Sequence, residues 1–196
     1  MAFVVVYDAC VLYPAPVRDL LIRIANAGVV RARWTHRILD ECFRSIREQR
    51  PDLVPGALDR TRQLMNDAVA DCLIVGYEPF IEGLALPDPD DRHVLAAAIR
   101  ANAQVIVTFN LTDFPAEALA PYDVEAKHPD DFVLDSIDLA PAAVARCVTE
   151  QAAALRNPPA SVAQVLDTLR ARGLAQSVAR LRELFGPSAI LDEASA

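Results

Sequence analysis

The chain has 196 residues, of which 53% are hydrophobic, and a formal net charge of −8 at pH 7. This length suits one domain of ordinary size plus an appendage, and the apolar content excludes a largely disordered chain. The net negative charge argues against a protein that coats nucleic acid by bulk electrostatics, because phosphate binding needs local positive charge.

The charge is distributed unevenly along the chain. Residues 1–66 contain ten arginines and seven acidic residues, whereas residues 67–196 contain nine basic and twenty acidic residues. A basic patch on an acidic body is therefore one interpretation of the early arginines, and an ordinary solvated helix face is the other. These arginines are Arg31, Arg33, Arg37, Arg44, Arg47 and Arg50.

The sequence gives no sign of a membrane segment or of an oxidising compartment. No apolar run reaches the roughly 20 residues that a membrane-spanning helix needs. Met1 leads into a strand-like segment and not into a charged and then apolar leader, so we expect a cytoplasmic protein. The cysteines have no C-x-x-C spacing, and we expect reduced, buried thiols without zinc or disulfides. They are Cys10, Cys42, Cys72 and Cys147.

Strand and helix patterns alternate from the start of the chain. Residues 3–7 form a continuous apolar, β-branched run, which is typical of a central strand in a parallel sheet. Residues 17–27 repeat apolar side chains at helical spacing and predict a crossover helix. Residues 29–34 suit a short strand, and Thr35 suits the N-cap of a helix that Pro51 ends.

The alternation continues through the middle of the chain. We predict a helix from Pro55 or Gly56 to about residue 70, and a short strand over 72–75. A proline-rich loop then leads into a helix over 91–101. The remaining elements are a strand over 104–108, a short helix over 116–120, an edge strand over 123–126 and a helix from Pro129.

This order of elements predicts an α/β fold with β-α-β units around a mostly parallel sheet. From Leu139 onward strand patterns cease and three helical stripes follow, so we predict an α/β domain over 1–137 and a helical C-terminal extension over 138–196. The extension is too short to bury much core alone, and we expect it to pack on the main domain or on a partner. The stripes are Val144, Cys147, Val148, Gln151 and Leu155, then Val162, Val165, Leu166 and Leu169 after a Ser161 cap, then Leu174, Val178, Leu181 and Phe185.

Four acidic residues accompany these predicted elements. The carboxyl ends of strands in an open α/β sheet face one crevice, so acids from distant segments can meet there. Carboxylates brought together raise one another's pKa unless cations compensate, which favours a site for a hard cation such as Mg²⁺ or Mn²⁺. The acids are Asp8 after the first strand, Glu41 on a helix, Asp91 at a helix start and Asp113 beyond the strand at 104–108.

Each acid also has a structural interpretation. Asp8 could cap the turn after its strand, and Asp113 could form a loop turn. Glu41 could pair with an arginine at helical spacing, either Arg37 or Arg44. The third acid could favour the positive end of a helix dipole.

The choice of the third acid has near neighbours as alternatives. Asp88, Asp90 and Asp91 lie close together, and Asp90 is also a plausible helix N-cap. We select Asp91 and keep the other two as alternative ligands.

Four segments together resemble the ordered motifs of PIN-domain nucleases, with VapC-type toxins as the nearest likeness. The resemblance covers about residues 1–137 and lies in the order and context of the motifs, since a single Asp after a strand says little. Cys10 departs from the pattern, because many relatives carry Ser or Asn there. The segments are Val6-Tyr7-Asp8-Ala9-Cys10-Val11-Leu12, Leu39-Asp40-Glu41, Asp90-Asp91-Arg92-His93-Val94-Leu95-Ala96-Ala97-Ala98 and Thr108-Phe109-Asn110-Leu111-Thr112-Asp113-Phe114.

The resemblance implies a PIN-like three-layer α/β/α fold and a metal-dependent endoribonuclease. It would leave 5′-phosphate and 3′-hydroxyl ends, with one or two Mg²⁺ or Mn²⁺ ions. Thr108 and Asn110 also match the motif and would orient a ligand water or a carboxylate, with ordinary loop hydrogen bonding as the alternative. The implied catalytic and metal-binding residues are Asp8, Glu41, Asp91 and Asp113.

The resemblance also implies partners. They are an RNA substrate, a cognate antitoxin that often places a basic side chain in the acidic pocket, and a second copy in a homodimer. Two other functions stay open, namely a noncatalytic PIN-like module that binds RNA or protein and a structure-specific DNA nuclease.

Histidine and tryptophan offer further candidates. His36, His93 and His128 share no ligand spacing, and we expect structural or surface roles for them. Trp34 could stack on an RNA base, but a core position at the end of a strand is the interpretation that we favour.

Overall fold

The computed structural model describes residues 3–54 and 56–191. Its chain forms two compact units, with divisions between residues 13 and 14, 29 and 30, and 128 and 129. The α/β unit contains the segments up to residue 13 and from 30 to 128, and the helical unit contains 14–29 and the segment from 129 onward. Each unit is described by itself.

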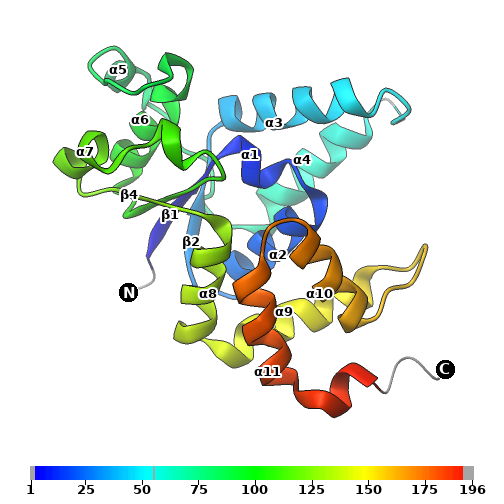
Figure 1. Cartoon of the computed structure of the whole chain (residues 1–196). Helices are drawn as coiled ribbons and strands as arrows, with labels where there is room; N and C mark the ends of the chain where they lie inside the picture. Colours follow the sequence, from blue (N-terminus) through cyan, green and yellow to red (C-terminus); the bar gives the residue numbers. More distant parts are fainter. Residues whose placement is uncertain (1–2, 55, 192–196) are drawn as a thin grey trace. The chain divides into compact units, whose positions relative to one another are not determined.

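The α/β unit is built around a four-stranded parallel sheet in the order β2-β1-β3-β4 (Figure 1). The first strand is central, as predicted, and its residues Val5, Val6 and Tyr7 are at most 1% exposed. A strand that is buried on both faces needs apolar side chains at every position, which explains the unbroken hydrophobic run. The strands are β1 (Val4–Tyr7), β2 (Arg31–Arg33), β3 (Val105–Val107) and β4 (Glu125–Lys127).

The predicted strand over 72–75 is reduced to a single bridge between Leu73 and Trp34. The Trp34 N–H donates to the Cys72 carbonyl at 2.9 Å, and the Ile74 N–H donates to the Trp34 carbonyl at 2.8 Å. Gly76 then turns the chain with a φ of 71°, a conformation that side chains with a Cβ rarely adopt. The turn ends the pairing before a full strand can form.

Helix α3 and the segment around α1 supply most of the residues that line the pocket described below. Thr35 caps α3 by accepting a hydrogen bond from the Ile38 N–H at 3.0 Å, as predicted. Helix α6 packs on β1 and β3 through a run of side chains, residues 93–98, that are at most 1% exposed. The helices are α1 (Ala9–Leu12), α3 (His36–Gln49), α4 (Ala57–Ala68), α5 (Glu78–Ile81), α6 (Arg92–Ala101) and α7 (Ala116–Leu119), with 3₁₀ turns η1 (Pro89–Asp91), η2 (Leu111–Asp113) and η3 (Ala120–Tyr122).

Several predicted boundaries shift by a few residues, and two short helices were not predicted. Gly56 precedes α4 with a φ of 84°, whereas Pro55, the other predicted start, lies outside the described residues. Helices α1 and α5 have only four residues each, too few to show a helical period in the sequence.

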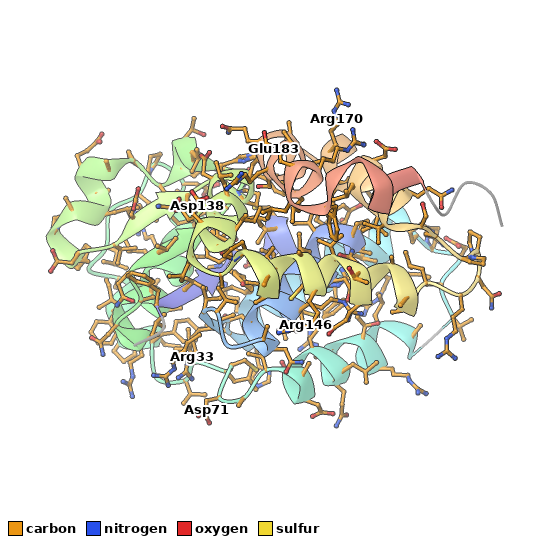
Figure 2. The ribbon with its side chains drawn as sticks, turned by 90° about the horizontal axis from the view of Figure 1, so that it is seen from below. Arg33, Asp71, Asp138, Arg146, Arg170 and Glu183 are labelled. Carbon is orange, nitrogen blue, oxygen red and sulfur yellow. The ribbon has the colours of Figure 1, made fainter. Side chains whose placement is uncertain are left out.

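The helical unit contains a helix from the early part of the chain. Helix α2 packs on α9 and α10, and the Gln151 side-chain amide donates to the Pro16 carbonyl at 2.9 Å. The extension therefore packs on a segment of the predicted domain 1–137. Charged side chains such as Arg170 project outward from the helices of this unit (Figure 2). Its helices are α2 (Ala15–Asn26), α8 (Pro129–Leu139), α9 (Pro141–Ala154), α10 (Val162–Ala171) and α11 (Ala175–Leu191), the last interrupted at Gly186.

The predicted helical stripes are largely confirmed. Ser161 caps α10 in a capping box with Gln164, and the apolar residues of that stripe are buried. Leu155 is an exception, because it is 46% exposed and takes an extended conformation at the C-cap of α9. The helix ends one residue earlier than the stripe required, so Leu155 leaves the buried face.

The division between the compact units differs from the predicted domain boundary after residue 137. Helix α8 lies in the helical unit, where it packs on α9 and α11. Asp130 on α8 accepts hydrogen bonds from the backbone N–H groups of Gln176 at 2.9 Å and Ser177 at 2.8 Å. These bonds fix the start of α11, which explains why α8 joins the C-terminal helices.

Within the described residues, no helix combines the length and the apolar character that crossing a membrane requires. The four cysteines are free thiols, as predicted, although Cys10 is only half-buried.

Candidate active site

A pocket of about 350 Å³ opens beside the carboxyl end of β1. Three of the four predicted acids, Asp8, Glu41 and Asp91, line it. They come from the end of β1, from α3 and from the turn before α6, so the fold gathers acids that lie far apart in the sequence. This is the convergence that strand ends in an open α/β sheet make available.

Asp8 is a buried carboxylate that is only 4% exposed. Its Oδ1 accepts from the Ala9 N–H at 2.6 Å, so Asp8 caps α1. Its Oδ2 accepts from the Thr108 hydroxyl at 2.7 Å and from the Cys10 thiol at 3.1 Å. Asp8 therefore caps the turn and also lines the pocket, as the two interpretations of the sequence predicted.

Two loop contacts fix the direction of these donors. The Asn110 N–H donates to Thr108 Oγ1 at 3.0 Å, which leaves the Thr108 proton for Asp8. The Phe109 N–H donates to Cys10 Sγ at 3.2 Å in the same manner. Burial, and then the charge of Asp8, raises the pKa of the Cys10 thiol to about 12, so the thiol keeps its proton and serves as a donor.

Glu41 is held by two basic side chains. Its Oε1 lies 3.2 Å from Arg37 Nε, and its Oε2 lies 3.1 Å from His93 Nε2. Burial acts to raise the pKa of Glu41, but the hydrogen bonds of His93 and Arg37 outweigh it and hold the pKa below its usual value. The predicted pairing with Arg37 is confirmed, and Glu41 stays ionised in the pocket.

His93 is a contact that sequence reasoning missed. The side chain is 1% exposed, and its Nδ1 is buried without a hydrogen-bond partner. Because Glu41 is ionised and can only accept, the Nε2 of His93 is the donor in this contact. His93 therefore holds an acid of the pocket, and no spacing in the sequence indicated this contact.

Asp91 is the acid of the pocket whose pKa is strongly raised. Burial is the main cause that raises its pKa to about 7, and the charges of other acids add to it. Asp91 is half-buried and lines the pocket, whereas Asp88 and Asp90 are exposed, and Asp88 caps the turn by accepting from the Asp90 N–H at 2.8 Å. The contributing charges belong to Asp8, Asp88, Asp113 and Glu41.

Asp113 and Asn110 take different positions around the pocket. Asp113 does not line it, but its charge acts on Asp91. Asn110 lines the pocket and holds Thr108 through its backbone N–H. Thr108 therefore contacts Asp8 directly, whereas Asp113 acts on Asp91 through its charge.

The donor set fits a hard cation that keeps part of its water shell. Within the described residues, no three His, Cys, Asp or Glu side chains form a ready-made cage for an ion. Mg²⁺, however, typically binds one or two carboxylates and retains several waters. A carboxylate has about four acceptor positions, so Asp8 can accept its three donors and still bind a cation.

The remaining pocket lining was not predicted. Tyr13, Ser45 and Gln49 also line the pocket, and the Tyr13 hydroxyl donates to Gln49 Oε1. Ser45 and Gln49 follow Glu41 at intervals of four residues on α3, a signal that is visible in the sequence once Glu41 is known to line the pocket.

The arginines of the predicted basic patch divide into two groups. Arg37 pairs with Glu41, and Arg50 pairs with Asp52. Arg44 and Arg47 are exposed and form no ion pair within the described part of the chain. These two are the cations of α3 that stay available to an anionic ligand.

The other aromatic and histidine candidates are structural. Trp34 is fully buried, and its indole N–H donates to Asn66 Oδ1 at 2.9 Å, so it has no free face for an RNA base. His128 packs edge-on against Phe109 with ring centroids 5.1 Å apart, and His36 lies exposed at the start of α3. The predicted core position of Trp34 is confirmed.

Comparison with known proteins agrees with this geometry. Residues 4–112 match the model of the PIN domain, and residues 129–183 match that of the VapC50 C-terminal domain. The chain is 46% identical over 95 residues to "Putative ribonuclease VapC50" of Mycobacterium tuberculosis (strain ATCC 25618 / H37Rv). That match covers 48% of this chain and 56% of the relative.

No solved structure matches the chain. The PIN match extends over more than half of the residues and contains three of the predicted acids, while the second match contains most of the helical extension. The chain therefore belongs to the PIN-domain family and is VapC-like, with a C-terminal helical extension on a PIN-like α/β/α fold.

Proposed function

We propose that this chain is a metal-dependent endoribonuclease that hydrolyses RNA phosphodiester bonds. The observation that carries the proposal is the gathering of acids at one pocket, where burial and then the charges of neighbouring acids raise the pKa of Asp91 to about 7. Such crowding destabilises a protein without a cation and is a poor structural device. Membership of the PIN-domain family and similarity to a protein named as a ribonuclease support the same activity.

Asp8 and Asp91 would hold the cation directly, with Glu41 and Asp113 acting directly or through water. When bound, Mg²⁺ or Mn²⁺ supplies a more acidic water as nucleophile and neutralises charge at the scissile phosphate.

The residues of the chain would prepare this chemistry. Thr108, Cys10 and the Ala9 N–H hold Asp8 in one orientation, so that no reorganisation is needed when substrate arrives. Arg37 and His93 hold Glu41 ionised. Asp91 would bind a proton near neutral pH and release it when a cation enters.

Partners follow from the charge of the site and from the family. Arg44 and Arg47 on α3 offer exposed cations for RNA phosphates, in spite of the net charge of −8. As the toxin of a toxin-antitoxin pair, the chain would bind an antitoxin whose basic side chain competes with the metal for the acids, and it would form a homodimer. An RNA substrate and four free thiols suit the cytoplasm.

The test is cleavage by the purified, partner-free protein. Total RNA and DNA would be incubated with Mg²⁺, Mn²⁺ or EDTA, with wild type and Asp8→Asn in parallel. We expect metal-dependent cutting of RNA that leaves 5′-phosphate ends and is lost in Asp8→Asn. Asp90→Asn and Asp91→Asn separate the neighbouring acids, and full activity in Asp91→Asn would remove Asp91 from the site.

The remaining outcomes identify the alternatives. Cutting of DNA alone would assign a DNA nuclease with the same chemistry. Intact RNA under every metal condition, with folded protein and a broad substrate panel, would assign a noncatalytic binding module.

A further inference from the structure

The pocket continues well beyond the acids. Glu41, Ser45 and Gln49 form one stripe of α3 with a spacing of four residues, and all three line the pocket. At 1.5 Å of rise per residue, Gln49 lies about 12 Å along the helix from Glu41. On the other wall, α1 connects Asp8 at its N-cap to Tyr13 at its C-cap, and both line the pocket. The pocket therefore has an acidic end and a neutral end.

The neutral end carries hydrogen-bonding groups without charge. Gln49 Oε1 accepts from the Tyr13 hydroxyl, so the amide NH₂ is the part of Gln49 that stays open to a ligand. Ser45 is exposed, and its hydroxyl makes no hydrogen bond within the described part of the chain.

The spacing along the pocket corresponds to the parts of one nucleotide. The acidic end suits a cation and the scissile phosphate, so the neutral end would face the ribose and base beside it. Single-stranded RNA is recognised by stacking of bases on aromatic rings and by hydrogen bonds to base edges. A volume of about 350 Å³ is sufficient for a small ligand of this kind.

We infer that Tyr13, Ser45 and Gln49 bind the nucleotide next to the scissile phosphate and set the base preference at that position. This inference rests on the proposed ribonuclease function and assigns the part of the substrate that its pocket selects. The amide NH₂ of Gln49 is a donor and pairs best with a base edge that presents acceptors and no donor amine. Uracil is the one base without an exocyclic amine, so uracil is favoured there over adenine, cytosine and guanine.

The hydrogen bond from Tyr13 determines the direction of this selection. The bond from Tyr13 uses one of the two acceptor positions of Oε1 and fixes the orientation of the amide, whereas the NH₂ of Gln49 makes no hydrogen bond among the described residues, so the donor is the group that Gln49 presents most freely. Tyr13→Phe keeps the ring but frees Oε1, so the amide can rotate and accept from an exocyclic amine. Gln49→Glu replaces the donor by an acceptor and favours bases with an exocyclic amine, namely adenine, cytosine and guanine, over uracil.

The first test is a map of cleavage positions on a random-sequence RNA pool with Mg²⁺. Wild type is expected to favour uracil beside the cut by roughly five- to tenfold, the value of one hydrogen bond. Gln49→Glu shifts the preference away from uracil toward the bases with an exocyclic amine, Tyr13→Phe weakens it, and Ser45→Ala lowers it by a smaller factor. Glu48→Gln is the matched control, because Glu48 is exposed on the same turn of α3 and does not line the pocket.

A second test separates this inference from the reaction. Asp8→Asn protein without metal would be titrated with fluorescent ten-nucleotide oligouridine and oligoadenine, alone and combined with Gln49→Glu. Preference for oligouridine that reverses in Gln49→Glu supports the inference, and it would do so even if wild type cut no RNA and the proposed function failed.

Three results overturn the inference. The first is an unchanged base preference in both Gln49→Glu and Tyr13→Phe, with circular dichroism showing folded variants. The second is the absence of binding by either oligonucleotide. The third is cleavage by wild type with no base preference beside the cut, which leaves the proposed function in place.

Discussion

Two buried aspartates, one in each compact unit, have nearly equal exposure and very different surroundings. Asp8 in the α/β unit is 4% exposed, and Asp130 in the helical unit is 5% exposed. The oxygens of Asp130 accept from the N–H groups of Gln176 and Ser177 at the start of α11. Those of Asp8 accept from a thiol, a hydroxyl and one N–H, and the side chain lines a pocket with other acids.

Burial of a carboxylate is therefore no sign of function by itself. Asp130 meets the positive end of a helix, where backbone N–H groups compensate its charge. Asp8 shares a pocket with Glu41 and Asp91, and the only bases bonded to this group among the described residues are Arg37 and His93, both on Glu41. Excess negative charge, and not depth, distinguishes the site, and the following predictions test this contrast.

The largest effect is expected for Asp8→Asn. We predict a loss of RNA cleavage of at least about 100-fold, because removal of a ligand or its support weakens metal sites by such factors. The free energy of unfolding should change far less than in Asp130→Ala, because relief of repulsion among the acids offsets the weaker hydrogen bonds of the asparagine. Initial cleavage rates and urea unfolding measure both. If Asp8→Asn lowered the free energy of unfolding enough to account for the loss of activity, Asp8 would be a structural residue like Asp130.

The converse is expected for Asp130→Ala. The N–H groups of Gln176 and Ser177 at the start of α11 lose their acceptor, so the free energy of unfolding should fall by about 2 to 3 kcal/mol. The remaining folded protein should cut RNA with an unchanged kcat. Asp131→Ala is the matched control, since exposed Asp131 accepts only from the Gln176 side chain at 3.2 Å and should cost little. Equal stability of the two variants would contradict the role of Asp130 as a cap.

A smaller effect is expected for Thr108→Val, which removes the hydroxyl between Asp8 and the Asn110 N–H with little change of shape. We predict a roughly tenfold loss of cleavage, or of Mg²⁺ affinity, because Asp8 loses its shortest side-chain donor. Thr108→Ser keeps the hydroxyl and should retain most of the activity. If both variants behave alike, packing of the methyl group and not the hydrogen bond matters at this position.

The smallest effect concerns Asp91 and pH. Its pKa is raised in the folded protein to about 7, so the folded state binds more protons than the unfolded state between about pH 4 and 7. Stability of the metal-free protein should therefore fall as pH rises through that window, by about 1 kcal/mol once solvent screening of a half-exposed group is considered. Urea unfolding in EDTA at pH 5 and pH 8 measures this change.

Asp91→Asn should remove the fall, and Mg²⁺ should reverse it in wild type with release of protons near pH 7. Helix α8 provides the contrast, since Asp131→Ala should leave the pH dependence as it is in wild type. An identical pH dependence in Asp91→Asn and wild type would show that the acids do not repel one another.

The sequence predicted the fold class well, because buried parallel strands need uninterrupted apolar runs and amphipathic helices need a period of 3.6 residues. Residues 3–7 and the stripe of α10 follow these rules closely. The predicted strand over 72–75 failed because pairing with Trp34 is limited by the turn at Gly76. The short helices α1 and α5 have no periodic signal at all.

The site was predicted in part. The order of the motifs located Asp8, Glu41 and Asp91, which line one pocket. The metal and the catalytic roles stay predictions, as do the roles of Thr108, Asn110 and Asp113. Contacts between distant side chains, such as His93 with Glu41, depend on how α6 and α3 face each other. No local spacing encodes that arrangement.

The sequence alone determined which residues can be buried, where strands alternate with helices and which acids follow the strand ends, since these depend on local hydrophobic pattern and residue type. Only the tertiary structure decided what the carboxylates meet. It placed Asp8 among other acids and Asp130 against helix N–H groups, and it continued the acidic pocket to Tyr13 and Gln49. The physical reason is that the charge, solvation and hydrogen bonding of a side chain depend on its neighbours in space, which chain folding brings together from distant positions.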